Sequence, residues 1–244
     1  MLAEATANIA RARTDLRVEN GSDYLVVGFF TPDYYPLADA LAENLDLFSI
    51  SYHLYATDKQ QGQWGHQTLR KPSVLKQARL DHPTRPLIFM DVDCSVRGDL
   101  ATMLTVDGDI AVPMGRKAMK NGTALKPGTR VIFVRPTTMS DRFLDAWEQS
   151  CQMDLNPVGN DEIRLQMAIE DSAGQFAIAV LPRPFTGMEI RKASAADMIV
   201  HDSARDEARF LGRLQKSFKH HFRVWRNLVY RRLFGRDYKS VGSR

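Results

Sequence analysis

One stretch of the sequence, Leu87 to Asp93, constrains the fold more than any other. Its first four residues, Leu87–Met90, are all apolar, which predicts a strand buried on both faces inside a parallel sheet. Asp91 and Asp93 follow directly, at the point where such a strand leaves the sheet. Open α/β sheets bind ligands at the carboxyl ends of their strands. The stretch therefore predicts an α/β fold with two carboxylates at its ligand-binding edge.

The flanking sequence supports a βαβ arrangement. Tyr24–Phe30 and Tyr52–Ala56 are expected strands, and the segment between them has an apolar stripe typical of a helix. A second helix is expected from Lys71, because proline at position 72 suits a first turn. Stripe residues are Leu37, Leu41, Leu45 and Phe48 in the first helix and Val74, Leu75, Ala78 and Leu80 in the second. Further along, we expect strands at 109–113, 129–134 and 176–181, helices at 138–153 and 161–172, and a loop at 116–128.

The composition is that of a globular protein. Of the 244 residues, 44% are apolar and 25% are charged, and no apolar run approaches the roughly 20 residues that cross a bilayer. Charged residues interrupt the first twenty positions, so no secretory segment is expected there. The two cysteines do not predict a disulfide framework. These features favour a cytoplasmic protein.

Charge is distributed unevenly along the chain. Residues 203–244 hold twelve Lys and Arg against three acidic residues, a net charge of +9, whereas the whole chain carries +4, so the remainder carries −5. Apolar residues recur every three or four positions through 208–236, which predicts a basic amphipathic helix. It could pack on the domain, or bind an anionic membrane surface at the inner face of the membrane. No nucleic-acid-binding module accompanies it, and we expect no nucleic-acid partner.

The Asp91–Asp93 pair differs from a second Asp-x-Asp in the chain. Asp107 and Asp109 flank a glycine in an expected turn, which favours a structural role. The carboxylates of Asp91 and Asp93 end a buried strand, where they would repel each other without a compensating cation or hydrogen bonds. Divalent cations such as Mg²⁺ take one or two carboxylates and complete their shell with substrate phosphates. We therefore expect metal–phosphate chemistry at Asp91 and Asp93.

A strand that ends in Asp-x-Asp also resembles haloacid-dehalogenase-type phosphatases. In that family the motif normally opens the catalytic domain, and Gly and Thr usually follow it. Here a complete βαβ unit precedes Asp91, and Cys94-Ser95 follow Asp93. The family's later Gly-Asp-x-x-x-Asp motif is missing from the sequence. The phosphatase alternative therefore fits less well.

The order of several motifs resembles the nucleotide-diphospho-sugar transferases of the GT-A fold. That family tends to have a Lys-Pro helix, a short loop, and then an apolar strand that ends in Asp-x-Asp. The similar segments here are Thr68–Ala78, Pro86–Asp93, Thr129–Arg135, Asp161–Leu165 and Ile199–His201, within residues 23–203. The chain departs from the family at Lys126-Pro127-Gly128-Thr129, where a turn rich in Gly or Ala is usual, at Glu162, where Gln is common, and at Cys94.

The resemblance implies a metal-dependent site. Asp93 would bind Mn²⁺ or Mg²⁺, Asp91 would share the metal or hold the ribose, and His201 would be a further ligand. The metal would stabilise the charge on the departing nucleoside diphosphate. Asp161 would be catalytic, facing the acceptor or the transferred sugar, with general base as a candidate role.

The same resemblance implies contacts to the donor. Lys71 would neutralise phosphate, and Phe29, Phe30 and Thr31 would lie near the nucleotide base. Structural alternatives remain for three of the implied site residues: a solvated lysine at a helix start for Lys71, a helix-dipole carboxylate for Asp161, and an ordinary satisfied histidine for His201.

The sequence thus predicts a GT-A-type α/β fold with a mixed, mostly parallel sheet. Residues 1–22 would be a helix or extension, 23–203 the catalytic domain, and 204–244 the basic tail. The expected activity is sugar transfer of the hexosyltransferase kind, from a nucleotide-diphosphate sugar to an unidentified glycan, lipid or protein acceptor. The alternative from another class is a non-catalytic, membrane-associated or binding protein that keeps this fold. The donor sugar, the stereochemical course and the oligomeric state stay open.

Overall fold

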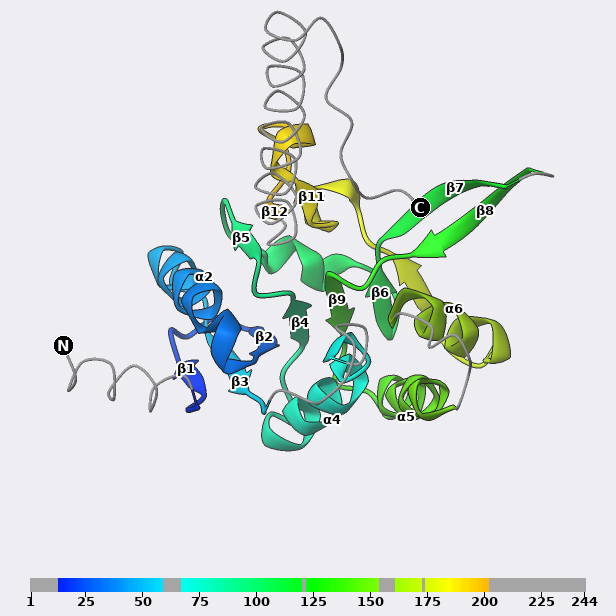
Figure 1. Cartoon of the computed structure of the whole chain (residues 1–244), viewed down its shortest axis with the longest axis horizontal. Coiled ribbons are helices and arrows are strands. Elements are labelled where there is room, and N and C mark those ends of the chain that lie inside the picture. The colour runs from blue at the N-terminus through cyan, green and yellow to red at the C-terminus, as the bar shows by residue number, and fades with distance from the viewer. Residues whose placement is uncertain (1–12, 59–66, 120–121, 154–160, 173, 202–244) are drawn as a thin grey trace, which may run out of the picture. The chain divides into compact units, whose positions relative to one another are not determined.

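A seven-stranded sheet forms the centre of the computed structural model, in the order β1-β3-β2-β4-β9-β6-β10 (Figure 1). β3, β2, β4, β6 and β10 run in one direction, and β1 and β9 run in the opposite one. The expected mixed, mostly parallel α/β sheet is therefore confirmed. The strands are β1 (Leu16–Val18), β2 (Leu25–Phe30), β3 (Tyr52–Ala56), β4 (Leu87–Met90), β6 (Ile110–Val112), β9 (Val131–Val134) and β10 (Ile178–Val180).

The structure describes residues 13–58, 67–119, 122–153, 161–172 and 174–201. All of them belong to one compact unit, which ends at His201. The predicted basic tail, 204–244, and the first twelve residues lie outside the described residues. Within the segment predicted as a helix or extension, Leu16–Val18 form an edge strand that pairs antiparallel with β3. Within the described segments, no helix is both long and apolar enough to cross a membrane.

Helices cover both faces of the sheet, which explains why its central strands are apolar throughout. Alternate residues of a strand point to opposite faces. In β2, Val26 and Phe30 join the core under α2, whereas Leu25 and Val27 join the core that includes α4, α5 and α6. The helices are α2 (Tyr35–Leu47), α4 (Lys71–Asp81), α5 (Thr138–Gln152) and α6 (Asp161–Asp171), with short 3₁₀ turns η1 (Pro32–Tyr34), η2 (Ala101–Thr105), η3 (Arg183–Phe185) and η4 (Ile190–Lys192).

The predicted apolar stripes are correct in part. Leu41 and Leu45 of α2 are buried, but Phe48 lies past the helix end and is 38% exposed. In α4, Ala78 is buried, as predicted, whereas Leu80 is 76% exposed. Two residues further along a helix correspond to a rotation of about 200°, so Leu80 points away from the face on which Ala78 lies.

Two smaller sheets flank the main one. β5 (Cys94–Val96) pairs antiparallel with β12 (Ile199–His201), and β12 pairs in parallel with β11 (Met188–Glu189). β7 (Met114–Met119) and β8 (Gly122–Pro127) form an antiparallel hairpin, seen as the long ribbon on the right of Figure 1. The predicted loop at 116–128 is therefore wrong. Local strand pairing satisfies the backbone there, and a polar, lysine-rich composition gives no sign of it.

A glycine brings the site-bearing strands together. A Cβ atom built on Gly28 of β2 would lie 2.7 Å from the carbonyl oxygen of Met90 in β4, a distance that real side chains do not tolerate. β2 and β4 are parallel neighbours, so their carboxyl ends lie at the same edge of the sheet. Gly28 therefore permits the close approach that places the residues after Phe30 and Met90 next to each other.

Candidate functional site

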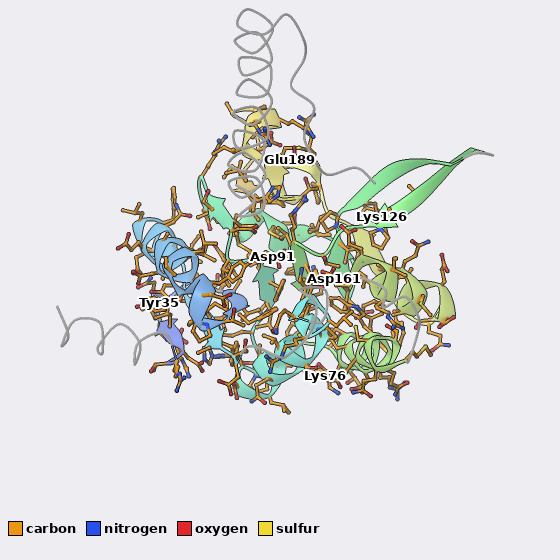
Figure 2. All side chains as sticks on the ribbon, viewed as in Figure 1. Tyr35, Lys76, Asp91, Lys126, Asp161 and Glu189 are labelled. Carbon is orange, nitrogen blue, oxygen red and sulfur yellow. The ribbon has the colours of Figure 1, made fainter. Side chains whose placement is uncertain are left out.

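A buried lysine joins two carboxylates at the end of β4. Lys71 Nζ lies 2.8 Å from Asp91 Oδ1 and 2.9 Å from Asp161 Oδ2, and its side chain is 3% exposed. The same ammonium donates to the backbone oxygen of Thr129 at 3.0 Å and to its hydroxyl at 3.2 Å. The hydroxyl of Thr129 in turn donates to Asp161 Oδ2 at 2.5 Å. The network ties α4 and α6 to the residue after β4 and to the segment before β9, near the centre of Figure 2, where Asp91 and Asp161 are labelled.

Burial and the neighbouring charges shift the pKa values of the three ionisable groups in this network. Burial by itself would lower the pKa of Lys71, but the carboxylates of Asp91 and Asp161 outweigh it and hold that pKa above its usual value. Burial would raise the pKa of the Asp161 carboxyl, but Lys71 and the hydrogen bonds from Thr129 and Thr68 hold it below its usual value. Burial raises the pKa of Asp91 to about 6, and the charges of Asp93 and Asp161 add to this effect against that of Lys71. The solvated-lysine alternative for Lys71 is therefore wrong.

Asp93 lies on the other side of Val92 in a different environment. Its Oδ1 atom is buried and has no hydrogen-bond partner within the described residues. His201 Nδ1, on β12, is likewise buried without a partner there. The antiparallel register pairs His201 with Cys94, the residue after Asp93. Strands that are more than a hundred positions apart in sequence thus place two unsatisfied polar atoms in one neighbourhood.

The imidazole of His201 has a backbone partner. A backbone hydrogen bond at Met188 acts on the imidazole, whereas Nδ1 has no partner among the described residues. Burial lowers the pKa of His201, and the charge of Arg130 adds to this effect. Both effects favour the neutral ring, the form in which a histidine binds a metal ion. A hydrogen bond to the backbone is a common support for a metal-ligating histidine.

The donor set fits a cation that shares its shell with phosphate. Among the described residues, no group of three or more His, Cys, Asp or Glu side chains is arranged to hold a metal ion. Both oxygens of Asp91 lie within 3.1 Å of Lys71 Nζ. Next to Asp91 within the described segments, Asp93 Oδ1 and His201 Nδ1 are buried ligand atoms without a partner. Mg²⁺ and Mn²⁺ commonly take few protein ligands and complete their coordination with substrate phosphates and water.

The three residues after the middle of β2 have different environments. Phe30 is 1% exposed and packs edge-on against Tyr35, so its ring belongs to the core. The hydroxyl of Thr31 donates to Asp33 at 2.5 Å. Phe29 is half-buried, with its ring 6.2 Å from that of Phe89. Of the three residues predicted to lie near a nucleotide base, Phe29 alone has an aromatic ring that is partly accessible.

Sequence reasoning missed the role of Thr129. The sequence places it at the start of an expected strand and at the end of the turn that departs from the GT-A pattern, yet it contacts both Lys71 and Asp161. The neighbouring Lys126 forms an ion pair with Glu162, which joins the hairpin to the start of α6 beside the site (Figure 2). No local pattern signals these contacts, because each joins residues more than thirty positions apart.

The fold matches that of solved glycosyltransferases. No protein-family model and no curated protein sequence matches the chain. A glycosyltransferase involved in glycosylation of the major capsid of PBCV-1 is 11% identical, with a TM-score of 0.57 over 75% of this chain and 95% of that chain. This likeness confirms the predicted GT-A-type fold.

Other solved structures show weaker similarity. The glycosyltransferase GlyE of Streptococcus pneumoniae TIGR4 is 14% identical, with a TM-score of 0.45 over 75% of this chain and 55% of that chain, so the chain spans about half of GlyE. The galactosyltransferase LgtC, in complex with donor and acceptor sugar analogues, is 10% identical, with a TM-score of 0.44 over 72% of this chain and 86% of that chain.

Proposed function

We propose that this chain is a metal-dependent glycosyltransferase that moves a sugar from a nucleotide-diphosphate donor to a glycan, lipid or protein acceptor. The observation that carries the proposal is the pair of buried, unpartnered atoms, Asp93 Oδ1 and His201 Nδ1, at the ligand-binding edge of a GT-A-type sheet. Buried polar atoms without partners are costly, and a ligand that satisfies both would recover that cost.

In this proposal Asp93 and His201 hold Mn²⁺ or Mg²⁺. When bound, the cation supplies positive charge to the diphosphate that leaves with the nucleoside. Asp91 is fixed by Lys71 and lies between the metal ligands and the rest of the network, where it can contact the ribose or share the cation. Lys71 acts by positioning Asp91 and Asp161, because its ammonium already contacts both carboxylates.

We assign Asp161 to the sugar or acceptor side of the site. Its lowered pKa keeps the carboxylate ionised at neutral pH, so it can accept a hydrogen bond from a hydroxyl of the sugar or of the acceptor. Lys71 and Thr129 hold the carboxylate in one orientation. Phe29 would contact the nucleotide base, with Phe30 and Thr31 supporting the strand end beneath it.

Nucleotide binding tests this proposal directly. We expect calorimetry to detect binding of UDP or GDP to the wild type in Mn²⁺, and weaker binding in EDTA. Asp93→Ala should abolish the gain from Mn²⁺, because it removes a metal ligand. Asp107→Ala is the matched control, since Asp107 belongs to the second Asp-x-Asp and is exposed. Absence of nucleotide binding by the wild type under both conditions would exclude the transferase.

The donor sugar can then be identified by hydrolysis. Many glycosyltransferases release the sugar slowly to water, so incubation with a panel of nucleotide sugars and detection of free nucleoside diphosphate would show which donor the protein accepts. A nucleotide that binds tightly while none of its sugars is cleaved would favour the non-catalytic alternative.

A membrane contact through residues 208–236 rests on the sequence alone, since that segment lies outside the described residues. Its spaced apolar residues and basic charge support binding to an anionic surface. Full-length protein should sediment with phosphatidylserine vesicles at low salt and much less with phosphatidylcholine vesicles. Equal sedimentation with both would contradict an electrostatic contact.

A further inference from the structure

Arg130 lies beside the acidic end of β4. It is the last residue before β9, and its backbone oxygen accepts a hydrogen bond from the amide of Asp91 at 2.9 Å. The antiparallel register pairs the next residue, Val131, with Met90. The backbone of Arg130 therefore adjoins the point at which β4 gives way to the two carboxylates.

The side chain of Arg130 runs past Gly187. Arg130 Cβ and Cδ lie 3.6 and 3.8 Å from the position that a Cβ atom on Gly187 would take. Its stem thus passes the segment that leads into Met188, whose backbone holds the His201 ring.

The guanidinium of Arg130 is available to a ligand. The residue is exposed, and within the described part of the chain its guanidinium makes no hydrogen bond or ion pair. Its positive charge acts on His201 and Glu189, in agreement with the geometry. Lys71, the other cation near Asp91, is buried and already contacts two carboxylates. Arg130 therefore offers five N–H donors in a planar fork, the arrangement that binds phosphate well.

We propose that Arg130 binds the diphosphate of the nucleotide-sugar donor, beside Asp93 and His201. This inference rests on the proposed function and adds to it a second, permanent source of positive charge. The leaving diphosphate would be neutralised in part by the cation held by Asp93 and His201 and in part by Arg130. A site built in this way keeps part of its affinity for diphosphate when the cation is removed.

The effect of Asp93 on phosphate binding should then be opposite in the presence and in the absence of the cation. Without a cation, its carboxylate lies next to the phosphate position and repels it, while Arg130 attracts it. With a cation, the same carboxylate supports binding. Asp93→Ala should therefore weaken pyrophosphate binding in Mn²⁺ and strengthen it in EDTA, whereas Arg130→Ala should weaken it in both.

Calorimetry with UDP, GDP and inorganic pyrophosphate, each in Mn²⁺ and in EDTA, tests the inference. We expect Arg130→Ala to weaken binding roughly 10- to 100-fold in either condition, the range for hydrogen bonds to charged groups. The affinity of Arg130→Lys should lie between those of the wild type and Arg130→Ala, because lysine keeps the charge but lacks the planar fork of N–H donors. Arg142→Ala, which removes an exposed arginine on α5, is the control and should bind as the wild type does.

The outcomes separate this inference from the proposed function. Wild type that binds nucleotide, together with Arg130→Ala that binds it equally well, would overturn the role of Arg130 and leave the transferase proposal intact. Wild type that binds no nucleotide would overturn both. Arg130→Gln, which keeps most of the stem, serves as a second variant if thermal unfolding shows that Arg130→Ala is destabilised. If Arg130→Ala lost affinity in Mn²⁺ but not in EDTA, the contribution of Arg130 would depend on the cation, and an independent contact to the diphosphate would be contradicted.

Discussion

The site has two halves, separated by Val92, and they differ in how their polar atoms are used. In the closed half, Lys71, Asp91, Asp161 and Thr129 satisfy one another through contacts of 2.5–3.2 Å. In the open half, Asp93 and His201 each keep one buried atom without a partner among the described residues. The closed half fixes four segments of the chain in one geometry. The open half retains the capacity to bind something else.

This difference has a physical basis. A buried charge is tolerated when opposite charges and hydrogen bonds surround it. Removal of one member then leaves the remaining charges buried without compensation. A buried polar atom without a partner already carries a free-energy cost, so its removal changes stability little. Variants of the closed half should therefore act mainly on stability, and variants of the open half mainly on binding.

The largest effect on stability is expected for Lys71→Met. It leaves the carboxylates of Asp91 and Asp161 without their common cation, and we expect a loss of about 3–5 kcal/mol in the free energy of unfolding. Lys76→Met is the matched control on the same helix. Lys76 pairs with Asp145 and Glu148 near the surface, where ion pairs contribute about 1 kcal/mol or less. Urea denaturation that gives equal losses for both variants would contradict a closed network at Lys71.

The next comparison sets Asp161→Asn against Asp93→Asn. Asp161→Asn removes the ionised acceptor of Lys71 and Thr129, and should lower the free energy of unfolding by about 1.5–3 kcal/mol. Asp93→Asn should change it by less than about 1 kcal/mol, since the side chain has an unpartnered buried oxygen. For Mn²⁺-dependent nucleotide binding we expect the opposite: Asp93→Asn should lose more affinity than Asp161→Asn. If Asp93→Asn were the less stable protein, the distinction between the halves would fail.

Within the closed half, the smallest expected effect on stability is that of Thr129→Val. The substitution keeps the shape of the side chain and the backbone oxygen that Lys71 contacts, but removes the hydroxyl between Lys71 and Asp161. We expect a loss of about 1 kcal/mol in denaturation experiments. Thr129→Ser retains the hydroxyl and should recover much of this loss. A serine variant as unstable as the valine variant would show that the methyl group, not the hydroxyl, matters.

The elements of the main sheet could be predicted from local patterns. The apolar runs at Leu25–Phe30, Leu87–Met90 and Val131–Val134 are strands covered on both faces, as their composition indicates. The edges of the molecule were less predictable. β1 is a three-residue strand, and the β7–β8 hairpin has a polar sequence, so neither has a clear periodic signal.

By itself the sequence determined the strand–Asp-x-Asp junction and the central strands and helices of the α/β sheet, because these depend on residues close together in the chain; the GT-A type was implied by the resemblance of its ordered motifs to that family. Only the tertiary structure decided which polar groups meet. Lys71 and Asp161 are 90 positions apart, and Asp93 and His201 more than 100, so burial and strand pairing bring them together. Burial also decided their chemistry, since it turned a helix-start lysine into the centre of an ion-pair network and left one nitrogen of His201 available.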